Sequence, residues 1–170
     1  EIKELEVTVA LGLTDPPEGA FSDPRHPKLG WRLYSIDAEK FNQPINWTKL
    51  RVDYVIPEYR SELTGESYIL EMGFERLNGV DFKKGCYVGQ EVTARMKHKT
   101  ELHKGLVKIG SEETIINGEE LFLNDKPIGS VLTVYDRSAL AYVRLKNRDE
   151  ILSTKSTKRI FVDKNPIPSN

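Results

Sequence analysis

The sequence predicts a chain of mixed strands and helices that ends in a small, closed antiparallel β-barrel. From about residue 104 onward, apolar residues fall into five short strand-like stretches separated by tight breaks such as Asn124-Asp125. Open strand edges favour aggregation, so a run of short strands joined by tight turns is expected to close on itself. The expected barrel strands are residues 106–109, 120–123, 128–135, 139–145 and 158–162.

Upstream of the barrel, the pattern predicts two further strands. Residues 5–13 place Leu or Val at every second position, which predicts a strand with one buried face made of Leu5, Val7, Val9, Leu11 and Leu13. Residues 31–34 fit a short strand that returns to the first. The intervening residues 14–27 hold four prolines and are expected to form a loop.

Two short helices are expected before the barrel. The first is capped by Asn46 or Thr48 and runs to residue 55, because Pro57 stops it. The second covers residues 89–97 and is opened by a glycine. Between them, residues 61–80 contain turn signals and are expected to be irregular.

The composition is typical of a soluble globular protein. Of its 170 residues, 38% are hydrophobic and 30% are charged. The net charge of -1 argues against an overall positive electrostatic potential that would attract nucleic acid. No apolar run approaches the roughly 20 residues that a membrane helix requires, so no membrane partner is expected. The single cysteine excludes an intrachain disulfide and favours a reducing compartment. Because residue 1 is Glu, we expect the natural protein to begin earlier.

The segment around Cys86 is the strongest candidate for chemistry. Gly85 and Gly89 allow a tight turn and the close approach of a ligand. Lys83, Lys84 and the start of the second helix place positive charge near the thiol, which lowers a thiol pKa and favours the thiolate. The alternative is that Cys86 is a small buried apolar residue, which is the commoner fate of a lone cysteine.

Residues 84–91 match the K-G-C-[YF]-x-G-Q-E signature of the YgfZ family, which the chain resembles along most of its length. Residues 23–32 resemble that family's D-P-R-x-P-x-L-G-x-R stretch, and residues 77–82 resemble the approach to its cysteine. Residues 128–131 and 139–144 look like the barrel shared with the glycine-cleavage T-protein (GcvT). The signature positions are Lys84, Gly85, Cys86, Tyr87, Gly89, Gln90 and Glu91.

The resemblance implies an α+β fold. Residues 1–100 would form a folate-binding, GcvT-like module that lacks its N-terminal part, residues 101–163 the C-terminal antiparallel β-barrel, and residues 164–170 a flexible tail. It also implies an accessory protein, rather than an enzyme, that binds tetrahydrofolate and supports the assembly or repair of iron–sulfur proteins, including tRNA-modifying enzymes. The alternative is a tetrahydrofolate-dependent aminomethyltransferase like the T-protein. The implied location is the bacterial cytoplasm or the mitochondrial matrix.

The role of Cys86 within such a protein stays open at this point. A cluster normally takes four protein ligands, so this chain alone holds no cluster and no other metal. Cys86 lends one ligand to a cluster shared with a partner, exchanges thiol or sulfur groups, or guards a folate reaction. In each case Lys84 is expected to lower the thiol pKa, and Gln90 and Glu91 to orient the ligand or the loop.

Residues 83–104 carry six basic and two acidic side chains, a local charge of +4. This segment fits a folate polyglutamate tail, an acidic partner or an indirect RNA contact, or else a solvated surface. The basic residues are Lys83, Lys84, Arg95, Lys97, Lys99 and Lys104.

The remaining candidates each have two interpretations. Arg25 and Arg32 bind a ligand carboxylate in the folate pocket or form a structural ion pair. Glu71, a third pocket candidate, and Asp23 act as acid–base groups or, more simply, as surface or capping residues. Trp31 and Trp47 either stack on a pterin or, as we prefer, lie in the core. The spacing of Cys86 with the three histidines, His26, His98 and His103, fits no zinc site.

Overall fold

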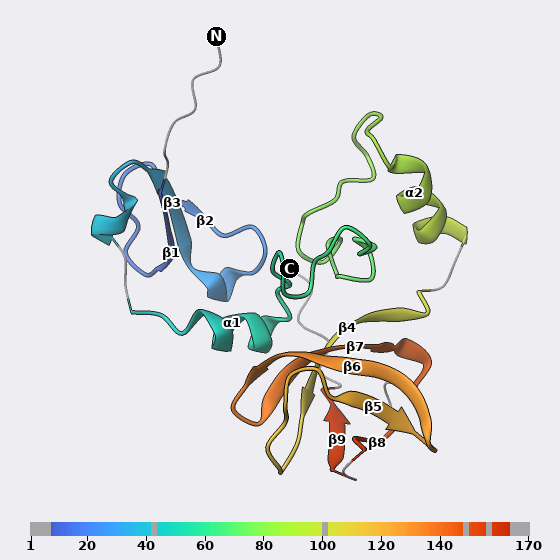
Figure 1. Ribbon diagram of the computed structural model, residues 1–170. Coiled ribbons are helices and arrows are strands. Elements are labelled where there is room, and N and C mark those ends of the chain that lie inside the picture. The colour runs from blue at the N-terminus through green and yellow to red at the C-terminus, as the bar shows by residue number, and fades with distance from the viewer. Residues whose placement is uncertain (1–7, 42–43, 100–101, 148–149, 156–157, 164–170) are drawn as a thin grey trace. The chain divides into compact units, whose positions relative to one another are not determined.

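The computed structural model describes residues 8–41, 44–99, 102–147, 150–155 and 158–163 (Figure 1). The chain forms two compact units, Glu1–Trp47 and Thr48–Asn170. The domain boundary predicted near residue 100 lies within the second unit, so the division into a folate-binding module and a barrel stays a prediction. The predicted tail, 164–170, lies outside the described residues.

The first unit is a three-stranded antiparallel sheet in the order β1-β3-β2. Its strands are β1 (Thr8–Leu13), β2 (Phe21–Ser22) and β3 (Trp31–Ser35), so both predicted strands are confirmed where the chain is described. Its core is made of Ala10, Leu13, Leu33 and Ala38.

The buried face predicted for the first strand is wrong at Val9, which is 41% exposed while Ala10 is fully buried. The register of β1 on β3 shifts between Ala10 and Leu13, and Gly12 in between has φ +68°. An extra residue in a strand moves the side chains that follow to the other face. Leu13 is therefore buried on the same side as Ala10, although strict alternation would separate them.

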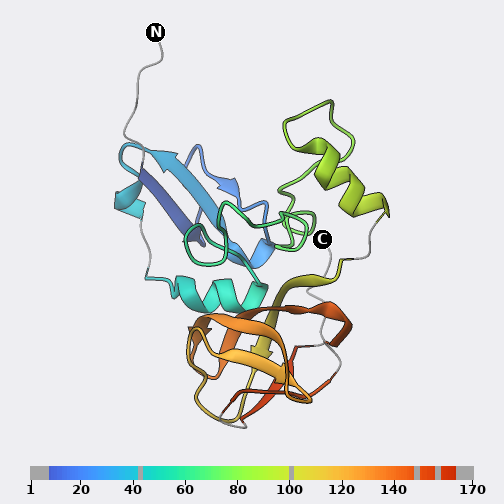
Figure 2. The same cartoon turned by 45° about the vertical axis from the view of Figure 1, so that its right-hand side comes forward.

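The helix α1 (Trp47–Tyr54), which confirms the first predicted helix, begins at the last residue of the first unit and continues into the second. Val52 and Val55 pack with Leu140 of the barrel. The helix lies against the outside of the barrel (Figure 2). The helix ends where Val55 takes a positive φ of 51° and the Ile56 N–H donates to the Arg51 carbonyl at 2.9 Å. Residues 57–80 then form successive turns, in agreement with the irregular segment predicted there.

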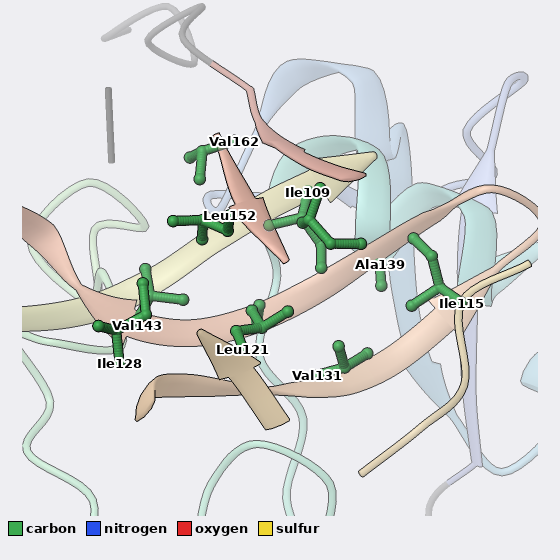
Figure 3. Packing of buried hydrophobic residues seen from close by; sticks show 11 residues of the cluster. Ile109, Ile115, Leu121, Ile128, Val131, Ala139, Val143, Leu152 and Val162 are labelled. Carbon is green, nitrogen blue, oxygen red and sulfur yellow. The ribbon is translucent and has the colours of Figure 1, made fainter. Parts of the chain in front are cut away.

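The C-terminal part of this unit is a closed barrel of six antiparallel strands in the order β4-β7-β6-β5-β8-β9, which confirms the predicted barrel (Figure 1). Side chains from all six strands and the loop before β5 fill it, among them the fully buried Ile109, Leu121 and Val131 (Figure 3). The sequence predicted five strands and missed β8, because two residues are too few to show a periodicity. The strands are β4 (Lys104–Gly110), β5 (Glu120–Leu123), β6 (Lys126–Tyr135), β7 (Ser138–Arg144), β8 (Leu152–Ser153) and β9 (Arg159–Val162).

The second predicted helix is α2 (Gln90–Lys99), which lies between the turn segment and the barrel in the chain. None of the described helices is both long and apolar enough to span a lipid bilayer.

Candidate functional site

Residues 81–89 form a loop that leads into α2, and local hydrogen bonds fix its end. Gly89 has φ +85°, a conformation that side chains disfavour, so glycine is required there. The Gly89 carbonyl accepts from both the N–H and the hydroxyl of Thr93, at 3.3 and 3.2 Å. The Tyr87 N–H donates to the Gln90 side-chain oxygen at 3.4 Å, and the Gln90 N–H donates back to the Tyr87 carbonyl at 3.2 Å. Gln90 thus closes the turn that follows the cysteine.

Cys86 is an exposed free thiol in this loop. The alternative of a buried apolar cysteine therefore does not hold. Neither Gly85 nor Gly89 has an atom within 4 Å of the place that a side chain would occupy, so space around both glycines is open. Among the described residues, no group of three or more His, Cys, Asp or Glu side chains is arranged to hold a metal ion. Any cluster at Cys86 would need its other ligands from elsewhere.

Lys84 lies against Tyr87, with its ammonium nitrogen 5.0 Å from the centre of the ring. A cation above an aromatic face is attracted by the ring's negative surface. The Tyr87 hydroxyl is buried and has no hydrogen-bond partner within the described part of the chain. Before Lys84, the Asp81 carboxylate accepts the Lys83 N–H at 2.7 Å and so fixes the start of the loop.

A groove of about 630 Å³ runs between the turns of residues 67–81 and the cysteine loop with the start of α2. We call it the motif groove. Its walls combine apolar and aromatic side chains with a few polar ones, and its charged groups are the Lys84 ammonium and the Asp81 carboxylate. Sequence reasoning missed the half of the groove that comes from residues 67–81, because turns carry no periodic pattern. The residues used below are Tyr68, Phe74, Lys84, Tyr87, Val88 and Val92.

The basic segment is partly neutralised by carboxylates. Arg95 pairs with Glu91 at 2.9 Å, and Lys97 pairs with Glu75 at 2.5 Å. Lys97 also lies over the Phe82 ring, whose edge meets His98. Farther along, Lys104 lies over the Tyr142 ring and His103 is exposed, while the Lys99 side chain lies outside the described residues. The local charge of +4 therefore overstates the positive charge that a ligand would meet.

Arg25 and Arg32 both bind Asp23, which is only 4% exposed. The carboxylate accepts from Arg25 at 2.7 Å and from Arg32 at 2.9 Å. Burial by itself would raise the pKa of Asp23, but the hydrogen bonds and positive charges of the two arginines hold that pKa below its ordinary value. Of the two alternatives for the arginines, the structure contains the ion pair. The surface position expected for Asp23 is wrong, but the expected capping role is confirmed, because its carboxylate also accepts the Arg25 backbone N–H at 3.0 Å.

Trp31 is 37% exposed, which makes its predicted core position wrong. Trp47 is half-buried, and the Arg25 guanidinium carbon lies 5.1 Å from its ring centre. His26 caps a 3-10 helix, Pro27–Leu29, by accepting the Lys28 N–H at 3.1 Å. These three residues have structural contacts within the first unit.

Glu71 connects the turn segment to the barrel. Its carboxylate accepts the Tyr142 hydroxyl, and its backbone carbonyl accepts the Leu106 N–H at 2.9 Å. Burial and the bond to Glu71 both raise the pKa of Tyr142, so Tyr142 stays protonated and donates. Glu71 is not among the residues that line the motif groove. The residues predicted for a folate pocket are thus engaged with other groups of the chain.

No family model matches the chain. Several curated proteins are similar to it, and their names describe them as mitochondrial iron-sulfur cluster assembly factors of the IBA57 type. A homologue from Neurospora crassa is 36% identical over 98 residues, which cover 52% of this chain and 22% of the relative. The Mus musculus protein is 37% identical over 98 residues, covering 53% of the chain and 27% of the relative. The Homo sapiens protein is 36% identical over 95 residues, covering 51% and 27%. The match thus spans about a quarter of these relatives' length.

Proposed function

We propose that this chain is part of an iron–sulfur cluster assembly factor, and that Cys86 supplies one ligand to a cluster held mainly by a partner protein. The exposure of Cys86 in an open, glycine-flanked loop carries the proposal. The similarity to proteins named as iron-sulfur cluster assembly factors supports it.

The number of cluster ligands in this chain favours a cluster shared with a partner over one held by this chain alone. A [2Fe–2S] or [4Fe–4S] cluster takes four protein ligands, mostly cysteine thiolates. This chain has one cysteine, and the described residues contain no group of three or more His, Cys, Asp or Glu side chains arranged to hold a metal ion. A single ligand suits transfer, because a cluster bound through one thiolate on this side can leave when the partner's ligands or the next acceptor take over. The cluster is therefore cargo, and the thiol proton is released when iron binds.

The lysines before the cysteine fit this role. Clusters with thiolate ligands are anionic, and Lys83 and Lys84 place two ammonium groups next to Cys86 in the chain. Lys84 is held against the Tyr87 ring on one side of the loop. This positive charge favours the approach of an anionic cluster.

A serine substitution tests the proposal directly. In cells that lack the natural protein, we expect the Cys86→Ser variant to accumulate normally but to leave iron–sulfur enzymes inactive, while an enzyme without a cluster is unaffected. Ile151→Ser, which replaces another exposed apolar side chain on the barrel unit, is the matched control and should restore activity. If Cys86→Ser restores iron–sulfur enzyme activity as well as the wild type does, the proposal is wrong.

Folate binding is a separate proposal, supported by the family resemblance. Because Arg25, Arg32 and Glu71 are engaged within the chain, no step of the cluster proposal passes through folate. Titration of tetrahydrofolate into the natural protein, with and without Cys86, tests binding. Turnover of an aminomethyl donor in the same experiment would favour the transferase alternative.

The wider setting follows from the same resemblance. We propose that the partners are iron–sulfur assembly or client proteins, among them tRNA-modifying enzymes, with any RNA contact indirect. The expected compartment is the mitochondrial matrix in a eukaryote or the cytoplasm in a bacterium. Cofractionation of the natural protein with matrix or cytoplasmic markers checks the compartment.

A further inference from the structure

We infer that the motif groove is a docking site for a partner-protein segment that presents a large apolar side chain next to a carboxylate. The inference rests on the proposed function, since it assigns the chemistry of the partner that meets Cys86.

Apolar side chains surround the groove without being covered. Val88 is fully exposed, and Val92, one helical turn farther along, is 54% exposed. Tyr68, which lines the groove from the turn segment, is 51% exposed. Single exposed apolar residues need no explanation, but three that line one groove mark an interaction surface.

The exposed residues favour a chain segment over a small molecule. A small aromatic ligand would fill the space between Phe74 and Tyr87 but would leave the fully exposed Val88 in water. A segment of polypeptide can place one apolar side chain in the groove and cover Val88 with its backbone and neighbouring residues. Burial of Val88 and Val92 would then stabilise the complex in proportion to the apolar surface removed from water.

The charge around the groove selects an acidic segment. Lys84 lines the groove, and neither Lys84 nor its neighbour Lys83 forms an ion pair among the described residues. In contrast, Arg95 and Lys97 on α2 are both paired with carboxylates. The Asp81 carboxylate, which also lines the groove, accepts the Lys83 N–H. The ammonium groups of Lys83 and Lys84 outnumber the Asp81 carboxylate, so a partner carboxylate would meet a net positive charge at this end of the groove.

The groove also brings the partner to the thiol. Cys86 and Val88 are two residues apart, so their Cα atoms lie within about 7 Å of each other. A segment that covers Val88 therefore brings its own flanking residues next to Cys86. Docking at the groove would position the partner's cluster ligands beside the single thiol that this chain offers.

A labelled peptide tests the inference. The probe is a short fluorescent peptide that alternates phenylalanine and glutamate, and binding to the natural protein is measured by fluorescence anisotropy. Two peptides serve as controls: one has lysine in place of glutamate, and the other has serine in place of phenylalanine. We expect only the first peptide to bind, and added salt to weaken its binding.

Matched substitutions locate the binding site. Val88→Ser and Val92→Ser are each expected to weaken binding about tenfold, the effect of losing one modest apolar contact. Ile116→Ser, at an equally exposed apolar residue of the barrel, should leave binding unchanged. Lys84→Glu should abolish binding, whereas Lys126→Glu, the same charge reversal at an exposed barrel position, should not.

The outcomes separate this inference from the proposed function. Cys86→Ser is expected to retain peptide binding, so loss of cluster assembly without loss of binding supports both proposals. Equal binding of all three peptides, no binding of the first, or equal effects of the groove and barrel substitutions would overturn the docking site and leave the role of Cys86 intact. Full competition by free benzoylglutamate would also overturn it, in favour of a small-molecule site.

Discussion

The barrel and the loop around Cys86 follow opposite patterns of burial. In the barrel, Ile109, Leu121 and Ile160 are fully buried, and hydrogen-bonded strands close the sheet. In the loop, Cys86 and Val88 are exposed, and the Tyr87 hydroxyl is buried without a partner among the described residues. The comparison teaches that apolar burial is concentrated in the barrel, while the loop leaves a thiol and an apolar side chain exposed.

The connection between α1 and the barrel belongs with the stable region. Arg51 and Glu62 are each 4% exposed and form an ion pair, and the Thr133 hydroxyl of β6 donates to Glu62. Arg51 also reaches Glu58 at 2.8 Å and the Ile56 carbonyl at 3.3 Å. This network ties the helix, the turn after it and the barrel together.

The largest expected effect comes from breaking this network. Arg51→Met leaves the Glu62 carboxylate buried without its cation, so we expect the free energy of unfolding to fall by about 3–5 kcal/mol. Denaturant unfolding followed by circular dichroism measures the change. Adding Glu62→Leu to the same chain should recover most of the loss, because it removes the uncompensated charge. No recovery would show that the packing of the arginine side chain matters more than the ion pair.

The second test compares the removal of a buried side chain from the barrel with the removal of an exposed one from the loop. Leu121→Ala removes a fully buried side chain and should lower the free energy of unfolding by about 3 kcal/mol. Val88→Ala removes a fully exposed one and should change it by less than about 0.5 kcal/mol. The same denaturant titration applies to both variants. Similar losses in the two would mean that Val88 has contacts in solution that contradict its exposure here.

Two tyrosines, Tyr87 in the cysteine loop and Tyr142 in β7, should respond to loss of the hydroxyl with opposite signs. Tyr87→Phe removes a buried hydroxyl that has no partner among the described residues, so we expect unfolding to cost about 1 kcal/mol more. Tyr142→Phe removes a hydroxyl that donates to Glu71, so we expect it to cost about 1 kcal/mol less. Thermal unfolding of both variants checks the signs. A loss of stability in Tyr87→Phe would reveal a partner for its hydroxyl.

The smallest expected effect is a pH dependence at Asp53, which joins α1 to β4. Burial would raise the pKa of Asp53, but hydrogen bonds and charges from Lys108 and Lys49 outweigh it and hold the pKa below its ordinary value. The ion pairs therefore stabilise the fold above about pH 4, the ordinary aspartate pKa, and that contribution is lost as the pH falls through the lower folded-state pKa.

Stability measured across this pH range tests the sign. The difference in free energy of unfolding between the wild type and Asp53→Asn should shrink as the pH falls below about 4. Glu112→Gln, at an exposed carboxylate before β5, is the control. A difference that grows on acidification would contradict the lowered pKa.

Local patterns in the sequence determined much of this protein. Alternation and turn residues predicted five of the six barrel strands, and helical spacing with Pro57 predicted α1. The glycines on either side of Cys86 predicted an open turn, and that turn exposes the thiol. These features depend on residues a few positions apart, so the sequence contains them directly.

Tertiary structure decided the features that join distant residues. The bulge at Gly12 decided which face of β1 is buried, and burial of Asp23 brought Arg25 and Arg32 together in an ion pair. The wall that Tyr68 and Phe74 contribute to the motif groove has no periodic signal in the sequence. Such contacts depend on where the chain returns in space. Hydrophobic patterning fixes only the face on which a side chain lies, not the partner that it meets there.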